Sequence, residues 1–94
     1  MIVTVGGSEG IDIAWRARIN PGDEVITMNP SYVAYAPGVT LAGGTCVPIE
    51  LRHEDDFKLK PEALENAISD KTKVLLINFP SNPTGGVMTR EDYA

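Results

Sequence analysis

Short apolar segments alternate with segments of helical periodicity along the whole chain, and this alternation restricts the fold more than any other feature. The apolar segments are rich in β-branched residues and end at glycines, prolines or asparagines, as strands do. Residues 74–77, Val-Leu-Leu-Ile, form a continuous apolar run that suits a strand covered on both faces, as in a parallel sheet. We therefore expect four strands, at residues 1–5, 24–28, 45–51 and 73–78.

The segments between these strands carry apolar residues at helical spacing. We expect helices at residues 9–19, at residues 32–42 and from Pro61 onward, since proline suits the first position of a helix. Thr89, with Asp92 three residues later, predicts the start of a further helix. This order predicts an α/β fold with three αβα layers, a mostly parallel sheet and right-handed crossovers. Because the chain stops within its last helix signal, we expect a fragment rather than a finished domain.

Composition and charge argue against several functional classes. Of the 94 residues, 43% are hydrophobic and 22% are charged, which is typical of a globular protein. A net charge of −5 argues against binding to nucleic acid, because no basic stripe could neutralise phosphates. No apolar run approaches the ~20 residues that span a bilayer, and the N-terminus does not resemble a signal peptide. The single cysteine, Cys46, cannot form an intrachain disulfide, so we expect a cytoplasmic protein.

A glycine-rich turn, Gly6-Gly7-Ser8-Glu9-Gly10, precedes the first expected helix. Small residues there let backbone N–H groups approach an oxyanion, and the Ser8 hydroxyl adds another donor. The turn therefore predicts a phosphate site. An ordinary glycine turn in which Ser8 caps the helix explains the same residues equally well.

Two further polar segments follow expected strands. Tyr32, in Asn-Pro-Ser-Tyr, could stack on a planar cofactor, although taken alone it is better explained as an ordinary tyrosine at a helix entry. Asn82 lies in Asn-Phe-Pro-Ser-Asn-Pro-Thr-Gly, a loop whose prolines and glycine hold the backbone more tightly than a connector needs. A cis peptide bond between Asn82 and Pro83 is compatible with this loop. Ligands of open α/β sheets bind beyond the carboxyl ends of the strands, where both segments are expected to lie.

In their order and spacing these motifs resemble class I and II aminotransferases. The motifs are Gly-Gly-Ser-Glu-Gly, Pro-Gly-Asp-Glu-Val, Asn-Pro-Ser-Tyr and Asn-Phe-Pro-Ser-Asn-Pro-Thr-Gly. This is the fold-type I family that depends on pyridoxal 5′-phosphate (PLP) and includes the aspartate and aromatic aminotransferases. The resemblance covers the chain from residue 1 to residue 94, and implies a single partial domain within the family's large cofactor-binding domain.

The resemblance implies roles for five residues. Gly7, Ser8 and Glu9 match the turn that binds the cofactor phosphate, mainly through backbone N–H groups. Tyr32 matches the aromatic residue that stacks on the pyridine ring. Asn82 matches the asparagine that bonds the ring hydroxyl and lies near the substrate carboxylate, so it is also a substrate-binding residue. The acidic side chain of Glu9 departs from the family pattern, since a carboxylate beside a phosphate would repel it unless it turned outward.

The implied activity is transfer of an amino group from an amino acid to a 2-oxo acid through PLP, in a homodimer. The family's Schiff-base lysine has no match here, so the chain holds no catalytic residue and is not expected to be active alone. Two other functions stay open. One is a nucleotide-binding α/β module, although the fuller glycine fingerprint is missing. The other is a non-catalytic fragment whose sheet edges pair with copies of itself.

Three conspicuous residues are not assigned to a site. His53 has no second histidine or cysteine near it in the sequence, so no metal site is expected. Trp15 is expected in the core or at a subunit interface, and Cys46 is expected to be a small buried residue within a strand.

Overall fold

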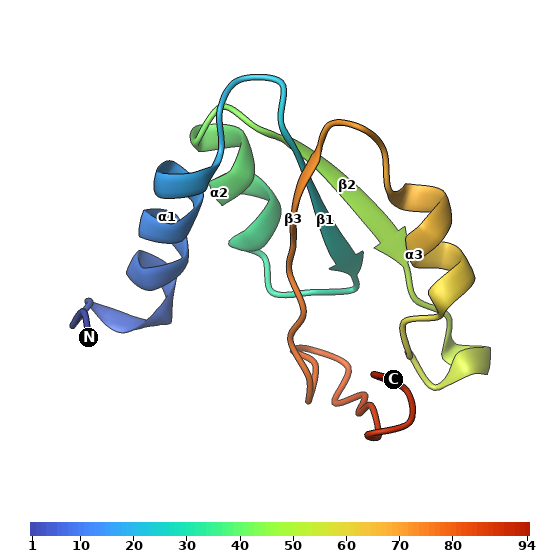
Figure 1. Cartoon of the computed structure of the whole chain (residues 1–94). Coiled ribbons are helices and arrows are strands. Elements are labelled where there is room, and N and C mark those ends of the chain that lie inside the picture. Colours follow the sequence, from blue (N-terminus) through green and yellow to red (C-terminus); the bar gives the residue numbers. More distant parts are fainter.

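The computed structural model describes all residues from 1 to 94, and its chain alternates between helices and strands as the sequence pattern predicts (Figure 1). Its elements, in chain order, are helix α1 (Gly6–Arg18), strand β1 (Glu24–Asn29), helix α2 (Tyr35–Leu41), strand β2 (Thr45–Glu50), the 3₁₀ helix η1 (His53–Asp55), helix α3 (Pro61–Ala67) and strand β3 (Thr72–Leu75). None of these helices has the length and apolar character needed to cross a membrane.

The three strands form one parallel sheet in the order β2-β1-β3, which confirms the predicted fold class. Strand β1 lies in the centre, and its four inner residues are all buried. Central parallel strands are covered on both faces, which explains why this segment lacks an alternating polar pattern. The sheet separates α1 and α2 from α3, so the chain has three layers (Figure 1).

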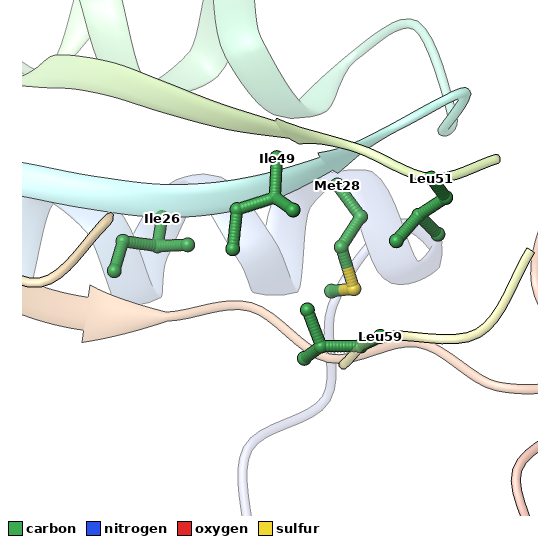
Figure 2. Packing of buried hydrophobic residues seen from close by; sticks show 5 residues of the cluster. All are labelled: Ile26, Met28, Ile49, Leu51 and Leu59. Atoms are coloured by element: carbon green, nitrogen blue, oxygen red, sulfur yellow. The ribbon is translucent and has the colours of Figure 1, made fainter. Parts of the chain in front are cut away.

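Successive residues of β1 face opposite layers, because side chains alternate along a strand. Val25 packs with Trp15, Ile19 and Val39 in the layer of α1 and α2. The next residue, Ile26, belongs to a second cluster on the side of α3. Figure 2 shows the members of this cluster, Ile26, Met28, Ile49, Leu51 and Leu59. Both helical layers are therefore held to the sheet by apolar packing.

The strand predicted at residues 1–5 is wrong, because this segment has no regular structure and is largely exposed. It carries a strand's residue pattern, but no neighbouring strand in the chain accepts its hydrogen bonds. A strand is stable only when its backbone groups are paired.

The other boundaries shift by a few residues. Helix α1 begins three residues earlier than predicted, and α2 begins three residues later, at Tyr35. Strand β3 ends at Leu75, although the Leu76 N–H still donates to the Ile26 carbonyl. Pro61 is at the start of α3, as predicted.

The helix predicted from Thr89 is wrong for this chain, because residues 90–93 form only a turn. Its capping pattern is nevertheless present. The Thr89 N–H donates to the Asp92 carboxylate at 2.7 Å, and the Asp92 N–H donates back to the Thr89 hydroxyl at 3.3 Å. These are the reciprocal hydrogen bonds of a capping box, with Asp in place of Glu.

Candidate functional site

The glycine-rich turn forms the first turn of α1, with no strand before it. The helix has no side-chain cap, and the Gly6 N–H donates to the Thr4 carbonyl. The N–H groups of the next residues, Gly7 and Ser8, have no partner in the chain, as is general at helix starts. A Cβ added at Gly6 or Gly7 would meet no atom within 4 Å, so space lies beside these amides. The turn can therefore receive an anion.

The side chain of Glu9 folds back over the same helix end. Its carboxylate accepts a hydrogen bond from the Val5 N–H. A negative charge is favourable at a helix N-terminus, where the backbone dipoles present their positive end. Glu9 therefore places one carboxylate close to the amides that would hold a phosphate.

Tyr32 lies in the connection between β1 and α2, and its side chain is 38% exposed. Its ring packs edge-to-face against Tyr35, with ring centroids 5.6 Å apart and an interplanar angle of 76°. Such contacts orient aromatic rings. Tyr32 therefore keeps a solvent-accessible ring that could stack on a planar group.

Asn82 lies in a tight loop that follows β3. The Ser81 N–H donates to the Gly86 carbonyl and the Gly85 N–H donates to the Ser81 carbonyl, each at 2.8 Å. The peptide bond between Asn82 and Pro83 is cis. Gly85 has φ of 73°, a left-handed conformation that glycine adopts without strain. We call residues 78–87 the asparagine loop.

A second segment supports the asparagine loop from one side. A Cβ on Gly86 would lie 3.3 Å from the Asp56 carbonyl oxygen, so the two backbones are in close contact there. The Lys58 ammonium donates to the Asp92 carboxylate at 2.8 Å, which ties the segment after η1 to the C-terminal turn. This hydrogen bond, with another from the Thr89 N–H, lowers the pKa of Asp92 to about 2.

The structure places the predicted site residues in different surroundings. Asn82 lines a small hollow at the carboxyl ends of β1 and β3, with a volume of about 10 Å³, which is room for about one water. This hollow, the strand-end hollow, is lined by Met28, Ser31, Tyr35, Leu76, Asn78, Ser81 and Asn82.

Ser8 instead lines a larger hollow between α1 and α2, of about 240 Å³, and Tyr32 lines neither. No single hollow of this chain contains all three residues. Drug-sized ligand pockets have volumes of about 300–1,000 Å³, so neither hollow encloses a complete cofactor site.

Sequence reasoning missed four polar residues of the strand-end hollow, Ser31, Tyr35, Asn78 and Ser81. The only signal for them was their position just after two expected strands, where the ligands of parallel sheets bind. Tyr35 is 8% exposed, as a residue that serves in packing would be, but it also borders this hollow.

The available groups suit a phosphorylated aromatic ring. The start of α1 offers unpaired amides for the phosphate, Tyr32 offers a ring for stacking, and Asn82 offers an amide that both donates and accepts. Two acidic groups carry unfavourable charge, Glu9 at the start of α1 and Asp12 in the hollow of Ser8.

Comparison with known proteins adds an independent finding. Residues 1–94 match the family model described as aminotransferase class I and II. An aspartate aminotransferase from Bacillus sp. (strain YM-2) is 48% identical over 92 residues, which cover 98% of this chain and 24% of that protein.

Two solved structures are similar to this fold. A single mutant of Thermus thermophilus aspartate aminotransferase superposes with a TM-score of 0.94 and 44% identity, over 97% of this chain and 24% of that one. The aromatic aminotransferase of Pyrococcus horikoshii OT3 gives a TM-score of 0.90 and 40% identity, over 94% and 24%. The chain thus spans about a quarter of the length of these relatives.

Proposed function

The chain belongs to the class I and II aminotransferase family, and from this premise we propose that the protein containing it transfers amino groups from an amino acid to a 2-oxo acid, with PLP as cofactor. The observation that carries the proposal is the family match of residues 1–94, and Asn82 supports it from a hollow at the carboxyl ends of two strands of a parallel sheet. Ligands of such sheets bind beyond the carboxyl ends of the strands.

We propose that residues 1–94 form part of the large cofactor-binding domain and that the Schiff-base lysine belongs to another part of the protein. The similarity to about a quarter of each relative supports this division. Two of the four lysines are already engaged, since Lys58 pairs with Asp92 and Lys60 pairs with Asp55 at 2.6 Å. The chain alone is not expected to catalyse the reaction.

Each proposed binding residue acts on one part of the cofactor, and Asn82 also serves the substrate. The N–H groups of Gly7 and Ser8, with the Ser8 hydroxyl, bind the phosphate, and Glu9 contributes only through its backbone. Tyr32 orients the ring by stacking. Asn82 donates a hydrogen bond to the ring hydroxyl oxygen and lies beside the substrate carboxylate. Once bound, the cofactor supplies a conjugated ring that accepts electrons from the substrate.

The test is cofactor binding by the full-length protein. We expect the absorbance band of bound PLP. Reduction with borohydride should then attach the cofactor permanently to the protein. Asn82→Ala should weaken PLP binding about tenfold, because an unsatisfied polar partner costs roughly 1–3 kcal/mol.

Asn66→Ala, on the exposed face of α3, is the matched control and should leave PLP binding unchanged. Tight binding of a dinucleotide by the full-length protein, together with no response to PLP, would overturn the proposal in favour of a nucleotide-binding module.

We also propose that the protein is a cytoplasmic homodimer. The free cysteine, Cys46, is in keeping with a reducing compartment. Both outer strands of the sheet, β2 and β3, have one edge without a partner in this chain, and such edges favour association. Light scattering that gave the mass of a single subunit for the full-length protein would contradict the dimer.

A further inference from the structure

We propose that Tyr35 is a positioning residue of the cofactor site, supporting Tyr32 with its ring and facing Asn82 with its hydroxyl. Tyr35 lines the strand-end hollow and also packs its ring against that of Tyr32. It thereby links two residues that lie far apart in the sequence. The inference rests on the proposed function, because it concerns how these two residues are held toward PLP.

The ring of Tyr35 is anchored while that of Tyr32 is accessible. Tyr35 is the first residue of α2 and is 8% exposed, whereas Tyr32 is 38% exposed. The edge-to-face contact, with ring centroids 5.6 Å apart, therefore sets an exposed ring against a buried one. An accessible tyrosine must lose rotamer freedom to stack on a ligand, and a fixed neighbour reduces that loss.

The hydroxyl of Tyr35 is not fully buried. This hydroxyl makes no hydrogen bond within the chain. It is nevertheless not among the fully buried side-chain atoms that lack a partner, since Trp15 Nε1 is the only such atom. The Tyr35 hydroxyl is therefore in contact with solvent space although its residue is buried. The space that Tyr35 borders is the strand-end hollow, which it shares with Ser81 and Asn82.

A packing role alone does not require this hydroxyl. A phenylalanine would fill the same volume, and a buried tyrosine normally gives its hydroxyl a partner. Here Tyr35 and Asn82 line the same hollow of about 10 Å³. In so small a space, a group or water bound by Asn82 is also within reach of Tyr35.

The experiment compares Tyr35→Phe and Tyr35→Leu in the full-length protein. Tyr35→Leu removes the supporting ring, so we expect PLP to bind about 2- to 10-fold more weakly. Combined with Tyr32→Leu it should add little further weakening, because the effect passes through Tyr32. Tyr35→Phe keeps the ring and removes only the hydroxyl. When it is combined with Asn82→Ala, the loss of PLP affinity should be smaller than the sum of the two single losses, because the hydroxyl acts through Asn82. Additive losses in both pairs would overturn the proposal.

A second readout separates this inference from the proposed function. In the cofactor-free protein, the ring of Tyr32 can be labelled with ¹³C and its motion measured by NMR relaxation. We expect Tyr35→Leu to loosen this ring, while Leu59→Ala, a destabilising change in the core cluster on the side of α3, should not. An unchanged Tyr32 ring in Tyr35→Leu refutes the support role. Absence of PLP binding by the wild-type protein would contradict the proposed function. The NMR comparison of the Tyr32 ring in Tyr35→Leu and Leu59→Ala would still test the support role.

Discussion

Glu9 brings a carboxylate to the end of α1 where the proposed function requires an anion to bind. The charge favours the helix, because it faces the positive end of the backbone dipoles, but it disfavours a phosphate at the same amides. These opposite effects make Glu9 a sensitive probe of the phosphate site. If Glu9 contacts the phosphate only through its backbone N–H, both effects of its carboxylate can be present together.

We predict that Glu9→Gln strengthens PLP binding by the full-length protein about two- to fivefold, because it removes a like charge near the phosphate. Equilibrium dialysis at low ionic strength would measure the change, and added salt should reduce it. Glu62→Gln makes the same charge change in the first turn of α3 and serves as the control. Equal effects of the two variants would argue against a phosphate at α1.

At the scale of elements, the C-terminal turn is joined to the segment after η1 by the pair of Lys58 and Asp92. The pKa of Asp92 is lowered from 3.8 to about 2, first by the hydrogen bond from Lys58 and then by the Thr89 N–H. A carboxyl group with a depressed pKa in the folded protein stabilises it above the unfolded pKa. This contribution is lost as the pH falls through the folded pKa.

We predict that Asp92→Asn lowers the stability of the full-length protein at pH 7, with a difference from wild type that shrinks between about pH 4 and pH 2. Urea unfolding midpoints at several pH values would measure this convergence. Asp70→Asn removes an exposed carboxylate without an ion pair and should behave like wild type. A constant difference for Asp92→Asn across this pH range would contradict the assignment.

The start of β2 packs tightly against both helices of its layer at Gly44. A Cβ there would lie 2.8 Å from Ile19 Cγ2, 3.1 Å from Val39 Cγ1 and 3.3 Å from the Asp23 carbonyl oxygen. These neighbours are buried core residues or backbone, so they cannot move away at low cost.

We therefore predict that Gly44→Ala destabilises the protein by about 1–3 kcal/mol, the usual cost of overpacking. Thermal or urea unfolding would measure it. Gly7→Ala is the control, since a Cβ there meets nothing within 4 Å and alanine favours a helix. A Gly44→Ala variant as stable as wild type would show that β2 shifts freely against the helices.

At the scale of the whole molecule, apolar surface remains at the N-terminal segment. Met1, Ile2, Val3 and Val5 are each at least 75% exposed. Their residue types favour a strand, and the unpaired edges of β2 and β3 present backbone groups that could accept one. In isolation the 94-residue chain should therefore associate with itself.

We predict that the isolated chain forms dimers or larger species and that Val3→Lys reduces this association. Light scattering over a range of concentrations would follow the mass. Val87→Lys adds the same charge at another exposed valine, in the asparagine loop, and should have little effect. An isolated chain that stays monomeric would refute the expectation.

Much of the fold follows from local pattern. The central strand β1, the turn at residues 20–23 and the start of α3 at Pro61 could all be predicted, because burial on both faces, turn chemistry and proline geometry act over a few residues. The parallel order of the sheet followed from the alternation of strands and helices.

The candidate site was predicted only in part. Asn82 and Tyr32 were recognised by their motifs, but their environments were not, and the partition of Ser8 and Asn82 between two hollows was not foreseen. Tyr35 has no motif that marks it as more than a core residue. Its place beside Asn82 arises because β1 and β3 end at the same edge of the sheet.

The amino-acid sequence by itself determined three of the four expected strands, the three helices between residues 6 and 67, and the motifs that carry the family resemblance, since each depends on neighbours in the chain. Only the tertiary structure decided that residues 1–5 stay unpaired and that Tyr35 joins the ring of Tyr32 to the hollow of Asn82. Both outcomes depend on which distant segments meet. Strand pairing and hollow formation require partners that local propensity cannot specify.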